Sequence, residues 1–370
     1  MTSPSSKKWL VPYNDLRPQL LHERREILSA VERVLLSGSL VMGQECEAFE
    51  QELAKKYGYK RAVGVASGTD ALELALRCFA RGGDVLTVAN SAPATVAAII
   101  RAGCKPVFCE VDVRGLMNPK LLGHFLTKDT KAIVPVDLYG QWCDRRAIVE
   151  FAKQHKLRVI EDAAQAYGSG HFPADLPDAM CFSFYPTKAL GALGDGGAVL
   201  TNDPDAETNM RELRFYGIAD RKSLFQIQMG FNSRLDEVQA AILRGRAMHV
   251  LEARAQRCGI AQRYDEDLPQ AFLSHGYDCN LNYHIFDIHV PNRDWFQMKL
   301  RELGVDTTVH YPVPAHRQVP TEVKERVLPM TERFCATTLS LPCWSGMTDE
   351  QVQLVIDSVC EVAEVKEPKS

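Results

Sequence analysis

Three polar residues near the middle of this chain have side chains suited to chemistry. Asp162 and Ser183 each end a short apolar run, and Lys188 follows Ser183 after a turn-like segment. A carboxylate can pair with a protonated ring nitrogen, a hydroxyl can bind a phosphate, and a lysine amine can form a Schiff base with an aldehyde. Pyridoxal phosphate carries all three complementary groups, so this ordered set predicts a binding site for that cofactor.

Two further segments extend the predicted site. Ser67-Gly68-Thr69 follows an apolar run and opens a helical pattern, so its amides, its hydroxyls and the helix dipole could bind the phosphate. Gln165 lies one helical turn after Asp162 and could donate a hydrogen bond to the phenolic oxygen of the cofactor. Each residue alone also has an ordinary interpretation, since serine and threonine cap many helices. The order of the whole set favours the cofactor site.

The elements that must position these residues alternate between short apolar runs and helical patterns. Seven apolar runs have the length and composition of buried strands, at 61–66, 84–88, 105–111, 132–136, 157–162, 180–183 and 197–201. The helices between them imply an α/β fold, with a mostly parallel seven-stranded central sheet covered by helices on both faces. Right-handed crossovers bring the loops after parallel strands to one edge, so we expect the candidate residues to meet there.

The chain is long enough for two domains, since 370 residues exceed what one compact core usually holds. Residues 1–245 carry an N-terminal helix at 15–35 and the alternation of strands and helices, and we expect them to form the large cofactor-binding domain. A continuous helical pattern at 237–263 leads into strand-like segments at 283–290 and 307–311 and a last helix at 349–362. Residues 246–370 are therefore expected to form a smaller C-terminal α+β domain.

Composition narrows the partners and the compartment. The net charge of −4 gives no reason to expect a nucleic acid or an anionic membrane surface as a partner. No apolar run approaches the ~20 residues of a membrane span, and the segment Met1–Lys8 has no apolar signal core. The eleven cysteines are odd in number and lack CxxC spacing, which argues against a disulfide framework and against a metal site. A cytoplasmic protein with free thiols is the expectation.

The same motifs resemble a known family. The chain is similar, from about Val11 to Val359, to the DegT–DnrJ–StrS type of sugar aminotransferase, a pyridoxal phosphate enzyme of fold type I. The motifs that carry the resemblance are Ser67-Gly68-Thr69-Asp70, Glu161-Asp162-Ala163-Ala164-Gln165, Ser183-Phe184-Tyr185-Pro186-Thr187-Lys188, Gly230-Phe231-Asn232-Ser233-Arg234 and His310-Tyr311-Pro312. The resemblance implies that Lys188 holds the cofactor and moves a proton, that Asp162 pairs with the pyridinium, and that Gln165 contacts the ring hydroxyl.

The resemblance also assigns the phosphate and the substrates. It implies that Gly68, Thr69 and Ser183 hold the phosphate. It further implies that Asn232 reaches the phosphate of the neighbouring subunit's cofactor, so the enzyme would be a homodimer with a shared active site. The residues expected to line the substrate pocket are Tyr185, Arg234 and His310.

One position departs from the family pattern. In the segment 90–95 the family usually has an aromatic residue that stacks on the cofactor ring, and this chain has Ala92. Loss of that contact could cost about 1 kcal/mol of stacking energy, by analogy with aromatic pairs elsewhere.

The resemblance implies an aminotransferase that takes an amino group from L-glutamate and delivers it to a nucleotide-linked 3- or 4-keto-(deoxy)sugar, in amino-sugar biosynthesis. Two alternatives stay open from the sequence. One is an aminotransferase for a keto-cyclitol or another small ketone, and the other is a non-catalytic regulatory protein on the same fold. The sequence leaves the sugar, its nucleotide and the position and stereochemistry of the new amine undetermined.

Overall fold

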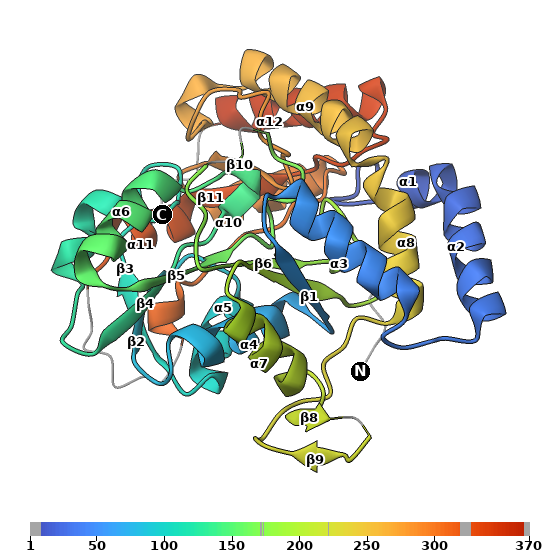
Figure 1. Ribbon diagram of the computed structural model, residues 1–370. Coiled ribbons are helices and arrows are strands. Elements are labelled where there is room, and N and C mark those ends of the chain that lie inside the picture. The colour runs from blue at the N-terminus through green and yellow to red at the C-terminus, as the bar shows by residue number, and fades with distance from the viewer. Residues whose placement is uncertain (1–8, 171, 173, 221, 319–326, 366–370) are drawn as a thin grey trace, which may run out of the picture.

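The computed structural model describes residues 9–170, 172, 174–220, 222–318 and 327–365 (Figure 1). The strands are β1 (Arg61–Val65), β2 (Asp84–Val88), β3 (Lys105–Cys109), β4 (Thr130–Val134), β5 (Arg158–Asp162), β6 (Ala179–Ser183), β7 (Gly197–Thr201), β8 (Ile218–Asp220), β9 (Phe225–Gln226), β10 (Phe286–His289) and β11 (Thr338–Leu341). The helices are α1 (Arg17–His22), α2 (Arg24–Ser37), α3 (Gln44–Lys56), α4 (Gly68–Phe79), α5 (Pro93–Arg101), α6 (Arg145–His155), α7 (Pro204–Leu213), α8 (Glu237–Ala247), α9 (Val250–Asp267), α10 (Arg293–Glu302), α11 (Pro329–Thr337) and α12 (Asp349–Glu364).

A seven-stranded sheet lies at the centre of the molecule, with the strand order β1-β7-β6-β5-β4-β2-β3. The pairs from β3 to β6 are parallel, and β7 runs antiparallel to both of its neighbours. Helices α4, α5 and α7 cover one face, while α3 and α6 cover the other (Figure 1). The mostly parallel α/β sheet expected from the sequence is therefore confirmed.

Successive strand residues pack on opposite faces, as a period of two requires. In β6, Cys181 packs with α4 on one face, whereas Met180 and Phe182 pack with α3 on the other. This alternation fixes which side chain at each strand end faces which layer. It also explains why buried strands of a parallel sheet appear in the sequence as continuous apolar runs.

A second hydrophobic cluster joins the C-terminal half of the chain. It includes Tyr264 of α9, Ile288 of β10, Leu339 of β11 and Val355 of α12, and Val11 from the start of the chain packs into it. The antiparallel pair β10–β11 and helix α12 match the expected α+β character (Figure 1). The proposed boundary between residues 1–245 and 246–370 stays a prediction.

Local boundaries differ from the sequence expectations in three places. The helix expected at 15–35 is two helices, because the chain leaves helical geometry at Glu23, whose buried carboxylate binds Arg246. The helical pattern at 237–263 breaks at Met248 and His249, between α8 and α9. The strand expected at 307–311 is only an isolated bridge from Thr308, and β11 pairs with β10 instead.

Within the described residues, no helix is both long enough and apolar enough to cross a lipid bilayer. From the amino-acid sequence we expect no signal sequence in segment 1–8, and this segment lies outside the described residues.

Candidate active site

A cavity of about 270 Å³ opens at the end of the central sheet where β5 and β6 finish. Seven of the residues singled out from the sequence line it: Gly68, Thr69, Asp162, Gln165, Ser183, Tyr185 and Lys188. They come from the start of α4, the ends of β5 and β6, and the loops that follow these strands. Parallel strands thus bring together residues that are more than a hundred positions apart in the sequence.

The start of α4 and the end of β6 approach each other so closely that only glycine fits between them. A Cβ atom on Gly68 would lie 2.6 Å from the Cβ atom of Ser183. A Cβ atom on Gly197 would lie 2.3 Å from the carbonyl oxygen of Ser67. The hydroxyl of Ser67 caps the helix by accepting a hydrogen bond from the amide of Asp70 at 3.1 Å. The exposed amides of this helix start, with two nearby hydroxyls, fit a phosphate group.

Asp162 is a buried carboxylate that faces the cavity without an ion-pair partner among the described residues. Its Oδ2 accepts a hydrogen bond from the Thr95 hydroxyl at 2.8 Å, and its Oδ1 accepts one from the Ala164 amide at 3.2 Å. Burial raises the pKa of Asp162, while these two hydrogen bonds and the positive charge of Lys188 oppose the rise. A cationic ring nitrogen in the cavity would supply the missing positive charge.

Lys188 lines the same cavity as Asp162, on the loop after β6. Burial lowers the pKa of its amine to about 8, although the carboxylate of Asp162 acts in the opposite direction. A substantial fraction of the amine is therefore neutral near physiological pH. A neutral amine can attack an aldehyde carbon and can accept a proton, which are the two properties that a catalytic lysine needs.

Gln165 is held at the wall of the cavity from two sides. Its Oε1 accepts a hydrogen bond from the amide of Tyr139 at 2.7 Å, and its Nε2 donates to the hydroxyl of Tyr311 at 3.3 Å. Burial raises the pKa of Tyr311 to about 12, with a further contribution from the charge of Asp162. The fixed amide of Gln165 offers a polar contact to a ring oxygen in the cavity.

The other three residues expected from the sequence do not line this cavity within the single chain. Asn232 is exposed, and the guanidinium of Arg234 lies over the Phe215 ring at 5.7 Å. The Nδ1 atom of His310 is 2.9 Å from the hydroxyl of Ser340. Burial, together with the charge of Lys188, lowers the pKa of His310 to about 4, so this histidine is neutral.

The sequence pattern did not predict the residues whose hydroxyl groups form hydrogen bonds with Asp162 and with each other. Thr95 binds its carboxylate, and the hydroxyl of Ser91 is 2.8 Å from that of Thr95. Both belong to the segment around Ala92, which also lines the cavity. A serine and a threonine four positions apart at a helix start could have signalled this pair, but the same pattern is common in ordinary caps.

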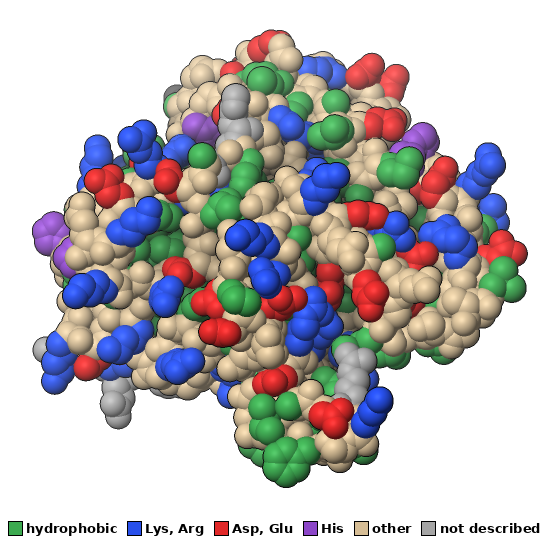
Figure 2. Space-filling model, viewed as in Figure 1, with side chains coloured by type: hydrophobic (Ala, Val, Ile, Leu, Met, Phe, Trp, Pro, Cys, Tyr) green, Lys and Arg blue, Asp and Glu red, His purple; other side chains and the backbone are tan. Residues whose placement is uncertain are grey.

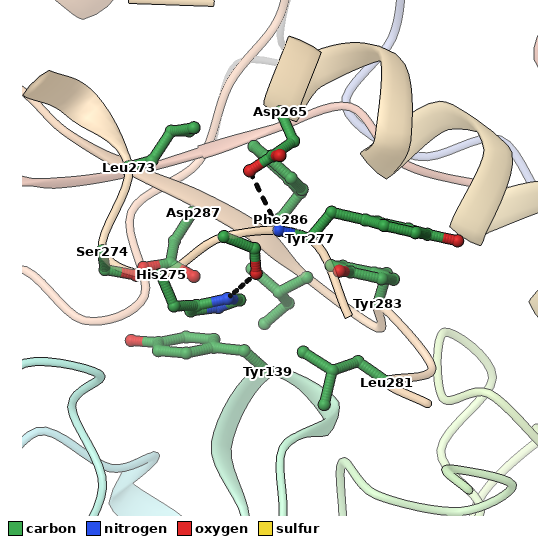
Figure 3. A pocket seen from close by; sticks show the side chains of 12 residues that line it. Tyr139, Asp265, Leu273, Ser274, His275, Tyr277, Leu281, Tyr283, Phe286 and Asp287 are labelled. Atoms are coloured by element: carbon green, nitrogen blue, oxygen red, sulfur yellow. Dashed lines mark hydrogen bonds between the residues drawn. The ribbon is translucent and has the colours of Figure 1, made fainter. Parts of the chain in front are cut away.

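Two other features lie apart from the cavity. A space of about 10 Å³ lies between Tyr139 and a loop of the C-terminal half. In this loop the amide of Tyr277 donates a hydrogen bond to Asp265 at 2.9 Å (Figure 3). This space is too small for any ligand larger than water. Three possible metal ligands, His22, His249 and Glu252, cluster at the α1–α9 contact, and none of them lines the cavity.

Comparison with known proteins decides the family. A model of the DegT/DnrJ/EryC1/StrS aminotransferase family matches residues 22–360. The chain belongs to this family. The sequence is 42% identical, over 92% of its length, to that of a dTDP-3-amino-3,4,6-trideoxy-alpha-D-glucose transaminase of Micromonospora megalomicea. The match covers 95% of that relative.

Solved structures of aminotransferases share the fold. The crystal structure of S. venezuelae DesV in complex with a ketimine intermediate is 37% identical, with a TM-score of 0.90 over 96% of this chain and 99% of that chain. The structure of NtdA from Bacillus subtilis with bound cofactor PMP is 28% identical, with a TM-score of 0.88 over 98% of this chain and 87% of that chain. The family and the fold expected from the sequence are both confirmed.

Proposed function

We propose that this aminotransferase uses pyridoxal 5'-phosphate to move an amino group from L-glutamate to a nucleotide-linked 3- or 4-keto-(deoxy)sugar. One observation carries the proposal: a lysine with a lowered pKa shares a cavity with a buried carboxylate and a glycine-walled helix start. The PMP bound to NtdA supports the cofactor. The Micromonospora relative is named for a dTDP-linked 3-amino sugar, so a dTDP-linked 3-keto sugar is the first acceptor to test.

Each group of the cofactor has a matching residue in the cavity. Gly68, Thr69 and Ser183 would bind the phosphate through backbone amides and hydroxyls. The carboxylate of Asp162 would accept a hydrogen bond from the ring nitrogen and keep that nitrogen protonated, while Gln165 would bind the ring hydroxyl. When bound, pyridoxal phosphate supplies an electron-withdrawing ring that stabilises negative charge on the substrate carbon.

The protein moves the proton. With the cofactor bound, the Nζ atom of Lys188 would remove a proton from the α-carbon of the amino donor, and in the acceptor half-reaction it would deliver a proton to the carbon that receives the amine. A pKa of about 8 suits both directions, because the amine gains and loses a proton at similar cost near neutral pH. The charge of Asp162 opposes deprotonation of Lys188 and so keeps its pKa from falling further.

We further propose a homodimer in which Asn232 completes the partner's site. Asn232 is exposed and follows the β8–β9 hairpin, which projects from the body of the molecule (Figure 1). Large apolar side chains are exposed on and beside this hairpin, including Phe225 at 68% and Met229 at 79% (Figure 2). Such an apolar patch is typical of a surface that contacts another protein.

The compartment and the domain boundary are also part of the proposal. All eleven cysteines are free, which is typical of a reducing compartment such as the cytoplasm. We place the boundary between the two domains at residues 245 and 246, since α9 contributes Tyr264 to the C-terminal hydrophobic cluster while α8 contributes Leu243 to the central one.

Mass spectrometry of products tests the function. The enzyme is incubated with L-glutamate and a panel of nucleotide-linked 3-keto and 4-keto sugars, and with keto-cyclitols for the alternative substrate class. We expect an amine on a nucleotide sugar. An amine formed only on a cyclitol would select the alternative, and the absence of any amine with every acceptor would contradict the proposal.

Two variants test the residues. Lys188→Ala should abolish turnover and the absorbance band of the lysine-bound cofactor, while Lys153→Ala, an exposed lysine on α6, should change neither. Asp162→Asn should keep the fold and lower turnover by about 10²–10⁴-fold at saturating cofactor, because the ring nitrogen loses its proton. Full activity of either site variant would overturn the role given to that residue.

A further inference from the structure

Four arginines are buried among the residues that the structure describes: Arg145, Arg214, Arg246 and Arg257. Three of them bind a buried carboxylate, in the pairs Arg145–Glu161 at 2.6 Å, Arg214–Glu50 at 2.8 Å and Arg246–Glu23 at 2.5 Å. Arg257 is 6% exposed and has no acidic partner in the described part of the chain. Its charge is therefore the unmatched one.

The contacts of Arg257 leave one nitrogen of its guanidinium unpaired within the described residues. Its Nε donates a hydrogen bond to the carbonyl oxygen of Asn282 at 2.7 Å, which holds the side chain in place. Its Nη2 is buried and has no hydrogen-bond partner within the described residues. An arginine does not lose its proton in a protein, so this buried charge persists and favours any anion that can reach it.

A small polar cavity of about 30 Å³ lies beside Arg257. Lys188 lines both this cavity and the large one, so the two spaces share the catalytic lysine as a wall residue. His284 and Thr187 complete the wall next to the lysine. The volume suits a group of a few atoms, such as a carboxylate, and is too small for a sugar ring.

The charges around this cavity also favour an anion. Asp15 lines it, but both oxygens of that carboxylate already bind the guanidinium of Arg17, at 2.6–3.1 Å. Burial lowers the pKa of His284 well below its usual value, and the nearby charges of Lys188 and Arg257 lower it further, so the imidazole is neutral. Arg257 is thus the fixed positive charge that a ligand at Lys188 would meet.

We propose that Arg257 binds a carboxylate of the amino donor, through its guanidinium, in the small cavity beside Lys188. This inference rests on the proposed function, since it gives L-glutamate and its product 2-oxoglutarate a binding group that the nucleotide sugar does not use. An amino acid anchored there would place its amine toward Lys188, which lines both cavities. Charge-assisted hydrogen bonds from arginine to carboxylate are among the stronger polar contacts in proteins.

The test separates the two half-reactions in the cofactor-loaded enzyme. Absorbance of the bound cofactor follows the reaction with L-glutamate, and the reverse change follows the aminated enzyme with the nucleotide keto-sugar. Arg257→Gln should raise the concentration of L-glutamate needed for half-maximal rate by about 10–100-fold, because a charged hydrogen-bond partner is lost. The concentration of keto-sugar needed for half-maximal rate should change less than about twofold.

Arg254→Gln is the matched control. Arg254 lies one turn earlier on α9, donates to the carbonyl oxygens of Cys279 and Leu281, and does not line the small cavity. It supports the same loop as Arg257, so equal effects of the two variants on L-glutamate would show a merely structural role. Arg257→Lys keeps the charge and should restore part of the glutamate affinity, and it replaces the glutamine variant if that variant does not fold.

Binding of succinate, an inert dicarboxylate, gives a readout that is independent of turnover. Calorimetry with the cofactor-loaded wild-type enzyme should detect binding that Arg257→Gln weakens by at least tenfold and Arg254→Gln leaves unchanged. If no keto-sugar is aminated but the binding of succinate still depends on Arg257, the proposed acceptor is wrong and the proposed carboxylate site stands. If sugars are aminated and Arg257→Gln uses L-glutamate normally, the carboxylate site is wrong and the proposed function stands.

Discussion

Glu161 and Asp162 are consecutive carboxylates on β5, yet they have different surroundings, because successive side chains of a strand lie on opposite faces of the sheet. Glu161 is fully buried against Arg145, which binds it through two hydrogen bonds of 2.9 and 2.6 Å. Asp162 lines the large cavity, and among the described residues its carboxylate accepts hydrogen bonds from the Thr95 hydroxyl and the Ala164 amide alone. One charge is matched within the protein, and the other is available to a ligand.

The buried arginines repeat this contrast. Arg145 is matched by Glu161 and stacked on Phe172, with 4.4 Å from the guanidinium carbon to the ring centre. Arg257 has a hydrogen bond to a carbonyl oxygen and a buried Nη2 without a partner among the described residues, and it lines the small cavity together with Lys188. Burying an unmatched charge is costly, so a protein that keeps one beside a cavity gains when a ligand of opposite charge binds. The difference separates structural charges from those expected to contact ligands.

The sharpest test of the comparison changes one carboxylate at a time. Glu161→Gln should lower the free energy of unfolding by about 3–5 kcal/mol, because Arg145 then remains buried without its partner. Asp162→Asn should change the free energy of unfolding by less than about 1 kcal/mol, since the amide oxygen still accepts a hydrogen bond. Urea denaturation of the cofactor-free proteins measures both values, and equal losses in the two variants would break the comparison.

The titration of Lys188 should show that the cavity holds an amine unlike those on the surface. With a pKa of about 8, half of the Lys188 amine is neutral at pH 8, roughly a hundredfold more than for an unperturbed lysine. Labelling of the cofactor-free protein with an acylating reagent between pH 6 and 10, followed by mass spectrometry, should show protonated and unreactive Lys188 below the midpoint and reactive Lys188 above it.

Asp162→Asn sharpens this titration. The negative charge of Asp162 raises the pKa of Lys188, so the midpoint should move to lower pH in the variant. A midpoint for wild-type Lys188 near that of a surface lysine would contradict the burial of its amine.

Thr95 tests whether Asp162 serves a ligand or the fold. Thr95→Val removes the 2.8 Å hydrogen bond to Asp162. Loss of this bond favours the protonated form of Asp162 and should weaken cofactor binding about tenfold. Thr95→Ser keeps a hydroxyl and should bind the cofactor within about threefold of the wild-type constant. Absorbance titration with pyridoxal phosphate provides the constants, and a variant that lost stability but kept cofactor affinity would give Asp162 a structural role.

Substitution of either of two glycines by alanine should have the smallest effect on stability or on cofactor binding. Gly259 lies on the exposed side of α9, and no atom lies within 4 Å of a Cβ placed there, so Gly259→Ala should stabilise the protein by about 0.5–1 kcal/mol. Gly68→Ala should instead weaken cofactor binding, because its Cβ would meet Ser183 at the phosphate site. Thermal unfolding and cofactor titration distinguish the two, and a tolerated Gly68→Ala would mean that the helix start is less tightly placed.

The central sheet could be predicted from the sequence, because buried parallel strands are short apolar runs whose number and positions along the chain can be seen directly. The sequence also predicted the residues at the strand ends, since Asp162, Ser183 and Lys188 follow those runs, and crossovers of one hand bring such ends to one edge. Seven of the ten residues named in advance line one cavity for this reason.

Which charges are matched follows from the packing of the elements in three dimensions and not from the sequence pattern. Arg145 and Arg257 look alike in sequence, as basic positions on helices, and nothing local shows that one meets Glu161 while the other faces the space beside Lys188. The support of Asp162 by Thr95 is equally hidden, because it joins residues from different elements of the fold. Electrostatic partners depend on distances between elements, and these distances are set by how the layers pack rather than by the pattern along the chain.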